Sequence, residues 1–131
     1  MNYPKFMERG AVHMEKGLNK FSFKTNATTK VLEIFTEGVF TPEDGAEYVK
    51  CYKAEVAKIT PGEYTLKFDC SNLELNRPEV LPILQGCFEM YKVNNFKKII
   101  ATVGNSKNSV ILKMQIGRLA RTVGLDNMEV I

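Results

Sequence analysis

The sequence predicts an α/β fold in which helices pack on one mixed β-sheet. The chain of 131 residues is long enough for one core, so we expect a single domain over residues 1–131, with residues 1–10 as an irregular N-terminal arm. Two observations predict this class. Short alternating runs open the chain, as in antiparallel strands, and after them strand patterns alternate with helix patterns, as in a parallel sheet. The predicted order is β-β-β-α-β-α-β-α-β, with the later strands parallel and the crossovers right-handed.

The opening strands are predicted from apolar residues that alternate with polar ones in residues 11–15, 21–26 and 31–36. Gly17 and Asn19 provide turn chemistry after the first run, and a polar break at residues 26–29 separates the second run from the third. We expect these strands to be antiparallel, because no helix pattern lies between them.

Three helices are predicted from start and stop signals. The first begins at Thr41, a preferred N-cap residue, with Pro42 at the first helical position, and it ends before Pro61. The second begins near Pro78, and the third ends at Gly124, a typical C-cap residue. The residues predicted to face the core are Val49, Tyr52, Val56 and Ile59 in the first helix, Val80, Leu84, Cys87, Phe88 and Tyr91 in the second, and Leu112, Ile116, Leu119, Ala120 and Val123 in the third.

The later strands follow these helices. Residues 63–70 predict a central strand, because Tyr64, Leu66 and Phe68 alternate with polar residues, and we expect it to end in an Asp-Cys-Ser-Asn turn at residues 69–72. The apolar run within residues 97–103 predicts a strand that is covered on both faces. Residues 127–131 are predicted to close the sheet as an edge strand.

The composition is that of an ordinary globular protein, with 44% hydrophobic residues, 25% charged residues and a net charge of +3. No apolar run approaches the roughly 18 residues of a membrane span, and the N-terminus does not resemble a signal peptide. The three cysteines, Cys51, Cys70 and Cys87, match neither a disulfide framework nor a zinc site. We therefore expect reduced thiols in the cytoplasm, with Cys51 and Cys87 on inner helix faces, and we expect neither a metal nor a cofactor.

Basic residues gather in the last third of the chain, at Lys92, Lys97, Lys98, Lys107, Lys113, Arg118 and Arg121. Such a distribution fits an acidic partner or a nucleic acid, and it also fits ordinary solvated helix faces. Because no exposed aromatic residues are interleaved with these cations, the sequence does not favour nucleic-acid binding.

The candidate binding surface consists of the loops after two parallel strands, because the carboxyl ends of such strands meet at one edge of a sheet. The residues predicted to bind a partner there are Asp69, Ser71, Asn72, Asn76, Arg77, Gly104, Asn105, Ser106 and Lys107. For Asp69 and Asn72 the pattern also fits local bonds to backbone amides. Helix amides, Arg77 and Lys107 make this edge positive, so we expect a protein partner with an acidic or carboxamide-rich patch.

The sequence gives less support to two other functional classes, a ligand carrier and an enzyme. A small-molecule or lipid carrier would need a cavity between helices and sheet, although ordinary core packing explains the same residues. The residues predicted to line that cavity are Met90, Tyr91, Phe96 and Met114. We do not expect an enzyme, because His13 is the single histidine and the carboxylates of Asp69 and Glu79 have no evident partner for acid–base catalysis.

Several segments carry a resemblance to a known family. Residues 37–42 read Glu-Gly-Val-Phe-Thr-Pro, a glycine between a strand and a helix, and residues 66–75 hold a strand followed by Asp-Cys-Ser-Asn-Leu. With the strand at residues 98–103 and the helix end at residues 119–125, these segments resemble the STAS domain of anti-anti-sigma factors over residues 31–131. The resemblance implies the α/β fold given above and a regulatory or scaffold domain that binds another protein.

The chain departs from that family at one place. The switching members carry an Asp-Ser-Ser-Gly segment whose serine accepts phosphate, whereas the corresponding segment here reads Asn76-Arg77-Pro78-Glu79. We therefore expect an interaction domain that is not switched by phosphorylation, and a homodimer is compatible with the sequence.

Overall fold

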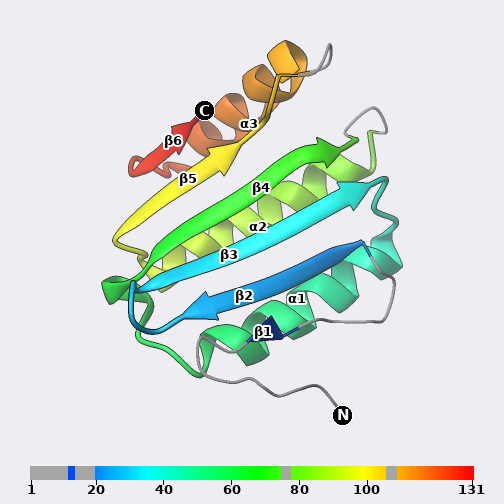
Figure 1. Ribbon diagram of the computed structural model, residues 1–131. Helices are drawn as coiled ribbons and strands as arrows, with labels where there is room; N and C mark the ends of the chain where they lie inside the picture. Colours follow the sequence, from blue (N-terminus) through cyan, green and yellow to red (C-terminus); the bar gives the residue numbers. More distant parts are fainter. Residues whose placement is uncertain (1–11, 14–19, 75–77, 106–108) are drawn as a thin grey trace.

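The computed structural model describes residues 12–13, 20–74, 78–105 and 109–131, which fold into one α/β domain (Figure 1). The predicted arm at residues 1–10 lies outside the described residues. The strands are β1 (Val12–His13), β2 (Phe21–Asn26), β3 (Val31–Gly38), β4 (Thr65–Leu73), β5 (Lys98–Thr102) and β6 (Met128–Val130). The helices are α1 (Pro42–Val56), α2 (Val80–Asn94) and α3 (Ser109–Val123), with a short 3₁₀ turn at Pro61–Glu63. The predicted order of elements is confirmed.

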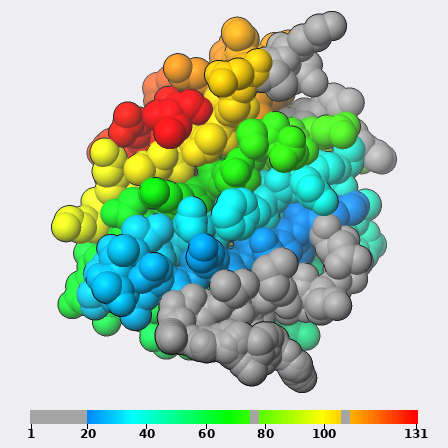
Figure 2. Space-filling view, viewed as in Figure 1, coloured from blue at the N-terminus to red at the C-terminus, as the bar shows by residue number. Residues whose placement is uncertain are grey.

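The strands lie in the sheet in the order of the chain, from β1 to β6. β1, β2 and β3 pair antiparallel, and β3, β4, β5 and β6 pair parallel, as predicted. The helices cover one face of this sheet, and Figure 2 shows the opposite face. Ile99 and Ala101 of β5 are buried under the helices, whereas Ile100 points to the open face and is half-buried. The prediction that this strand is covered on both faces is therefore wrong.

The central strand is longer than predicted. β4 continues to Leu73, so the Asp-Cys-Ser-Asn segment is part of the strand and the predicted turn is wrong. The cause is the length of β3, whose Glu37 and Gly38 still pair with Asn72 and Leu73. Between Phe35 and Glu37 the register shifts by one residue, so β4 accommodates the polar segment in a bulge while the pairing continues.

The core lies between the sheet and the three helices. The five residues predicted to face inward in α2 are all buried, and in α3 Leu112, Ile116 and Ala120 are buried while Leu119 and Val123 are partly buried. In α1 the inward face is centred on Tyr48 and Tyr52, and Val49 is only partly buried. Ile59, predicted as part of this helix, lies after its end at Val56 and is also partly buried. The sequence analysis missed Tyr48, because a tyrosine fits a surface position as well as a core position until its hydroxyl has a partner.

All three cysteines are buried and none forms a disulfide, and the predicted inward positions of Cys51 and Cys87 are confirmed. Burial raises the pKa of the Cys87 thiol to about 12, and burial together with the neighbouring Asp69 charge raises the pKa of Cys70 to about 12. Both thiols are therefore protonated at neutral pH and poor nucleophiles. Among the described helices, none has both the length and the apolarity needed to cross a lipid bilayer.

Candidate functional site

The candidate site is the edge of the sheet at which β3, β4 and β5 end, which we call the carboxyl edge. The end of β4 and the chain after β5 touch there, as the parallel pairing of these strands predicts. Gly104 has a φ of +76°, and a Cβ atom at this position would lie 2.9 Å from Cβ of Ser71. Glycine is required at this contact both for the left-handed backbone and for the space. Two of the predicted site residues, Ser71 and Gly104, are thereby brought together.

Asp69 and Ser71 form a local hydrogen-bonded pair at this edge. The Asp69 Oδ1 atom accepts hydrogen bonds from the Ser71 amide at 3.0 Å and from the Ser71 hydroxyl at 2.7 Å. Asp69 therefore makes the local hydrogen bond to a backbone amide that the sequence analysis gave as the alternative to partner binding. Asn72 and Asn105 are exposed, and their side chains make no hydrogen bond with the described part of the chain. Asn76, Arg77, Ser106 and Lys107 lie outside the described residues.

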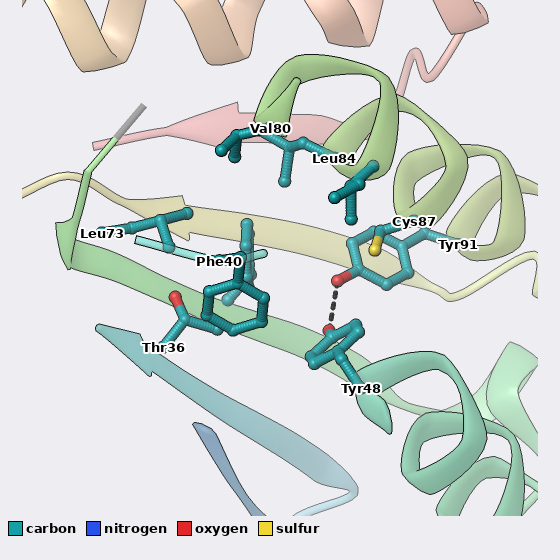
Figure 3. Close-up of a pocket in the computed structure, with 10 residues that line it drawn as sticks. Thr36, Phe40, Tyr48, Leu73, Val80, Leu84, Cys87 and Tyr91 are labelled. Atoms are coloured by element: carbon teal, nitrogen blue, oxygen red, sulfur yellow. Dashed lines mark hydrogen bonds between the residues drawn. The ribbon is translucent and has the colours of Figure 1, made fainter. Parts of the chain in front are cut away.

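An apolar pocket opens beside this edge, between the ends of β3 and β4, Tyr48 of α1 and the inner face of α2 from Val80 to Tyr91 (Figure 3). The helices approach closely because α1 carries a glycine: a Cβ atom on Gly45 would lie 2.6 Å from Cγ2 of Ile83. The centre of a water molecule can occupy about 20 Å³ of the pocket, which is room for one water molecule. The lining residues are Thr36, Phe40, Tyr48, Phe68, Leu73, Val80, Ile83, Leu84, Cys87 and Tyr91.

Two buried tyrosines meet in the wall of this pocket. The hydroxyl oxygens of Tyr48 in α1 and Tyr91 in α2 lie 2.5 Å apart, and either can donate the hydrogen bond (Figure 3). Burial raises the pKa of both phenols well above the ordinary value, so both are neutral at physiological pH. One hydrogen bond between two hydroxyl groups satisfies one donor, and the second O–H has no acceptor among the described residues. The single water that the pocket can hold would be a suitable acceptor.

The Tyr48–Tyr91 pair gives a testable prediction. Tyr48→Phe and Tyr91→Phe each leave the remaining buried hydroxyl without its partner, so each should destabilise the protein by about 1–2 kcal/mol. The double substitution removes both polar groups and should cost less than the sum of the single ones by about 1 kcal/mol. Urea denaturation of the four proteins measures this difference. If the losses of the two single variants add up to the loss of the double variant, the hydrogen bond between the two hydroxyl groups contributes nothing to the free energy of unfolding.

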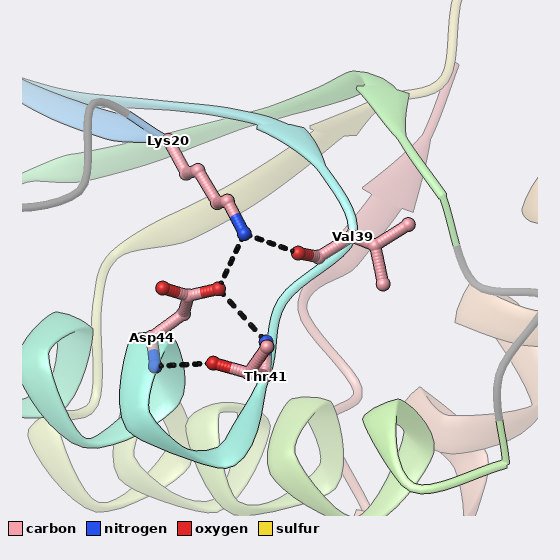
Figure 4. A network of polar contacts seen from close by, with 4 residues as sticks. All are labelled: Lys20, Val39, Thr41 and Asp44. Carbon is pink, nitrogen blue, oxygen red and sulfur yellow. Dashed lines mark hydrogen bonds and ion pairs between the residues drawn. The ribbon is translucent and has the colours of Figure 1, made fainter.

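A second polar cluster stabilises the start of α1 on the other side of the pocket (Figure 4). The Lys20 ammonium donates to Asp44 Oδ2 at 2.6 Å and to the Val39 carbonyl at 2.7 Å. The predicted N-cap, Thr41, is confirmed: its side chain accepts from the Asp44 amide at 3.1 Å, and Asp44 Oδ2 accepts from the Thr41 amide at 2.8 Å. This capping box joins β2 to α1 through the side chain of Lys20.

The pKa of Asp44 is lowered, although burial alone would raise it, because hydrogen bonds from Lys20 and Thr41 and the charge of Lys20 favour the carboxylate. A lowered folded-state pKa means that Asp44 stabilises the fold above its ordinary pKa of 3.8 and loses this effect as the pH falls through the folded-state value. Asp44→Ala should therefore cost about 2 kcal/mol at pH 7, and the difference from the wild type should shrink below about pH 4.

Thermal or urea denaturation across this pH range measures the effect of Asp44. Glu63→Ala is the matched control, because Glu63 forms only an exposed ion pair with Lys30 at 3.4 Å, and its loss should change stability by under about 0.5 kcal/mol. Equal losses in the two variants at pH 7 would contradict the structural role of Asp44.

The four residues predicted to line a ligand cavity do not share one cavity. Tyr91 and Phe96 are buried and line one pocket together, whereas Met90 lies with Val93 in a separate groove between α1 and α2. Met114 is 52% exposed, so its prediction as a cavity residue is wrong. The cause is its position in α3, where it lies on the side opposite to the inward residues Leu112 and Ile116.

The groups that the sequence analysis missed are Tyr48, Lys20 and Asp44. Asp44 followed Thr41 at the spacing of a capping box, so that signal was available in the sequence. The partners Lys20 and Tyr91 lie 24 and 43 residues away from Asp44 and Tyr48, and no local pattern indicates such pairs. Among the described residues, no group of His, Cys, Asp and Glu is arranged to hold a metal ion.

No protein-family model matches this chain, and no curated protein and no solved structure is significantly similar to it. The resemblance to STAS domains therefore rests on the sequence segments, and the structure adds only the α/β fold with its mixed sheet.

Proposed function

We propose that this protein is a non-enzymatic interaction domain, of the kind found among STAS-like regulatory or scaffold proteins, which binds another protein at the carboxyl edge. The observation that carries the proposal is the contact between Gly104 and Ser71 next to the apolar pocket. This part of the edge also displays the exposed side-chain amides of Asn72 and Asn105 beside the apolar pocket. A mixture of polar and apolar groups is typical of protein interfaces.

The positive charge at the carboxyl edge supports a partner with an acidic or carboxamide-rich patch. α2 and α3 both begin here, and the helix dipoles place positive partial charge at the start of each helix. A partner with an acidic or carboxamide-rich patch complements this edge, and the exposed amide groups of Asn72 and Asn105 can both donate to and accept from such a patch.

Binding is proposed to be independent of phosphorylation. The Ser71 hydroxyl donates a hydrogen bond to the Asp69 carboxylate at 2.7 Å. A phosphate on Ser71 would add roughly −1.5 to −2 charge beside that carboxylate and be repelled by it. The proposal also assumes a cytoplasmic setting, in which the three buried thiols remain reduced.

The alternative, a carrier or sensor of a small apolar ligand, has less support. The pocket at the carboxyl edge is apolar, but its cavity of about 20 Å³ for water centres is far below the several hundred Å³ of ordinary ligand sites. A carrier function at this pocket would require α1 and α2 to move apart at the Gly45–Ile83 contact. Native mass spectrometry of protein purified from its own cells tests this alternative, which requires a retained small molecule.

The proposed interface is tested by quantitative affinity capture from a lysate of the cells that express the protein. Asn72→Glu combined with Asn105→Glu should reduce recovery of the partner by about tenfold or more, because two carboxylates replace the amides and repel an acidic patch on the partner. Thr28→Glu is the matched control, since Thr28 lies in the exposed turn between β2 and β3, at the opposite edge of the sheet. Equal recovery with the double variant and with the control would refute the carboxyl edge as the binding surface.

A further inference from the structure

The outer face of α3 is unusually apolar for a solvent-exposed helix. Val110 is 70% exposed, Ile111 57% and Met114 52%, and together they cover the first turns of the helix. Among the described elements, α3 is the last helix along the sheet, and the helix beside it is α2 (Figure 1). The three side chains therefore form an apolar patch that the domain itself does not cover, which commonly marks an interaction site.

The same helix carries cations and no acid. Lys113, Arg118 and Arg121 are exposed, and none of them forms an ion pair with a described residue. In contrast, Lys20, Lys30, Lys58 and Lys98 each face a carboxylate. The outer face of α3 thus combines an apolar patch with unneutralised positive charge.

A glycine interrupts this face. Gly117 lies three residues after Met114 and four before Arg121, so Val110, Met114, Gly117 and Arg121 form one row along the helix. Glycine inside a helix is destabilising relative to alanine. Nothing in the domain requires it here, because a Cβ atom on Gly117 would meet only the Arg121 guanidinium, at 3.6 Å. A bare backbone between apolar and basic side chains is suited to the close approach of a second helix.

We propose that the outer face of α3 binds an amphipathic helix of a partner protein, whose apolar stripe is flanked by acidic side chains. The partner's apolar residues would cover Val110, Ile111 and Met114, and its carboxylates would pair with Lys113, Arg118 and Arg121. A second copy of this chain is not the occupant, because two such faces would bring cations against cations without any acid. The inference rests on the proposed function, that the domain binds another protein, and names a binding surface and a partner class.

The probe is a designed helical peptide of roughly 18 residues, about five turns, with leucine along one stripe and glutamate on both flanks. Its control has the same leucines with lysine in place of glutamate. Fluorescence anisotropy measures the affinities, and NMR chemical shifts locate the bound face. The acidic peptide should bind on α3 at least about tenfold more tightly than the basic one, and added salt should weaken it.

Three variants make the test specific. Met114→Glu should weaken binding of the acidic peptide by about tenfold or more, whereas Val93→Glu, at an even more exposed apolar residue of α2, should leave the affinity unchanged. Gly117→Leu should block the peptide while raising the thermal midpoint, because it adds a side chain to the helix face without burying it in the domain. No binding of the acidic peptide, equal binding of the two peptides, or shifts away from α3 would overturn the inference.

Binding to lipid vesicles tests whether the outer face of α3 binds a membrane instead of a partner helix. Basic and apolar residues on one helix face also suit an anionic membrane. If the protein binds vesicles of phosphatidylglycerol and phosphatidylcholine through Met114 and does not bind the acidic peptide, the inference is overturned. Failure here leaves the proposed function intact if the Asn72 and Asn105 double variant still loses its partner, so the two failures are distinguishable.

Discussion

Phe68→Ala is expected to destabilise the protein by about 3–5 kcal/mol, because it removes a buried ring and leaves a cavity. Phe68 is 2% exposed, and its ring lies 6.2 Å from Phe88 and 6.0 Å from Tyr91, measured between centroids. It also lines the apolar pocket, so the new void joins an existing one and the surrounding side chains have little to collapse onto. Urea denaturation at neutral pH measures the loss.

Phe35→Ala is the matched control for Phe68→Ala. Phe35 lies in the neighbouring strand β3, but it is 39% exposed on the sheet face that no helix covers. Its truncation should cost under about 1 kcal/mol, since little of the ring is removed from water. Similar losses at the two positions would mean that the faces of β3 and β4 are assigned incorrectly.

Gly104→Ala is expected to destabilise the protein by about 2–4 kcal/mol, which combines a backbone penalty with a steric one. The φ of +76° is unfavourable for any residue with a Cβ atom, and this atom would lie 2.9 Å from Cβ of Ser71. Ser71 lies in β4 and Gly104 lies two residues after β5, so the pairing of these two strands limits how far either residue can move away. The effect should appear as a lower midpoint in thermal and urea denaturation.

Two further variants separate the contributions at Gly104. Gly38 has nearly the same φ, +77°, but nothing lies within 4 Å of the Cβ position, so Gly38→Ala should cost only the backbone penalty of about 1–2 kcal/mol. Ser71→Gly in the Gly104→Ala background removes the clash and should restore at least about 1 kcal/mol relative to the sum of the single losses. Equal losses of stability for Gly38→Ala and Gly104→Ala would show that the backbone at the carboxyl edge moves to accommodate the new Cβ atom. Ser71 and Gly104 would then not be in close contact.

The two proposed surfaces have related positions, because α3 begins at the carboxyl edge and its apolar patch covers its first turns. A single partner that covered both would contact Asn105 and then continue along Val110 and Met114. The capture experiment with Asn72 and Asn105 and the peptide experiment with Met114 use different residues, and one surface can fail while the other holds. Loss of the partner in both sets of variants would indicate one continuous interface.

The order of elements, the positions of the helices and most of their inward faces were predictable from the sequence. These features depend on local physics: the capping residues at Thr41, the left-handed Gly124, and apolar residues repeated at the period of a helix or a strand. The buried face of α2 was predicted in full, because its inward residues are apolar or aromatic and recur at helical spacing.

The tertiary structure decided the features that depend on residues far apart in the chain. β4 extends through the polar segment at Asp69 because β3 offers pairing partners as far as Gly38, a fact that no local pattern of β4 contains. Tyr48 is buried because Tyr91, 43 residues away, binds its hydroxyl, and Asp44 is buried because Lys20 neutralises it. Polar groups can enter a core only with a partner, and the partner's position is set by the packing of whole elements. Local sequence therefore determined which elements form, and their packing determined which polar groups became part of the carboxyl edge and which helix face was left uncovered.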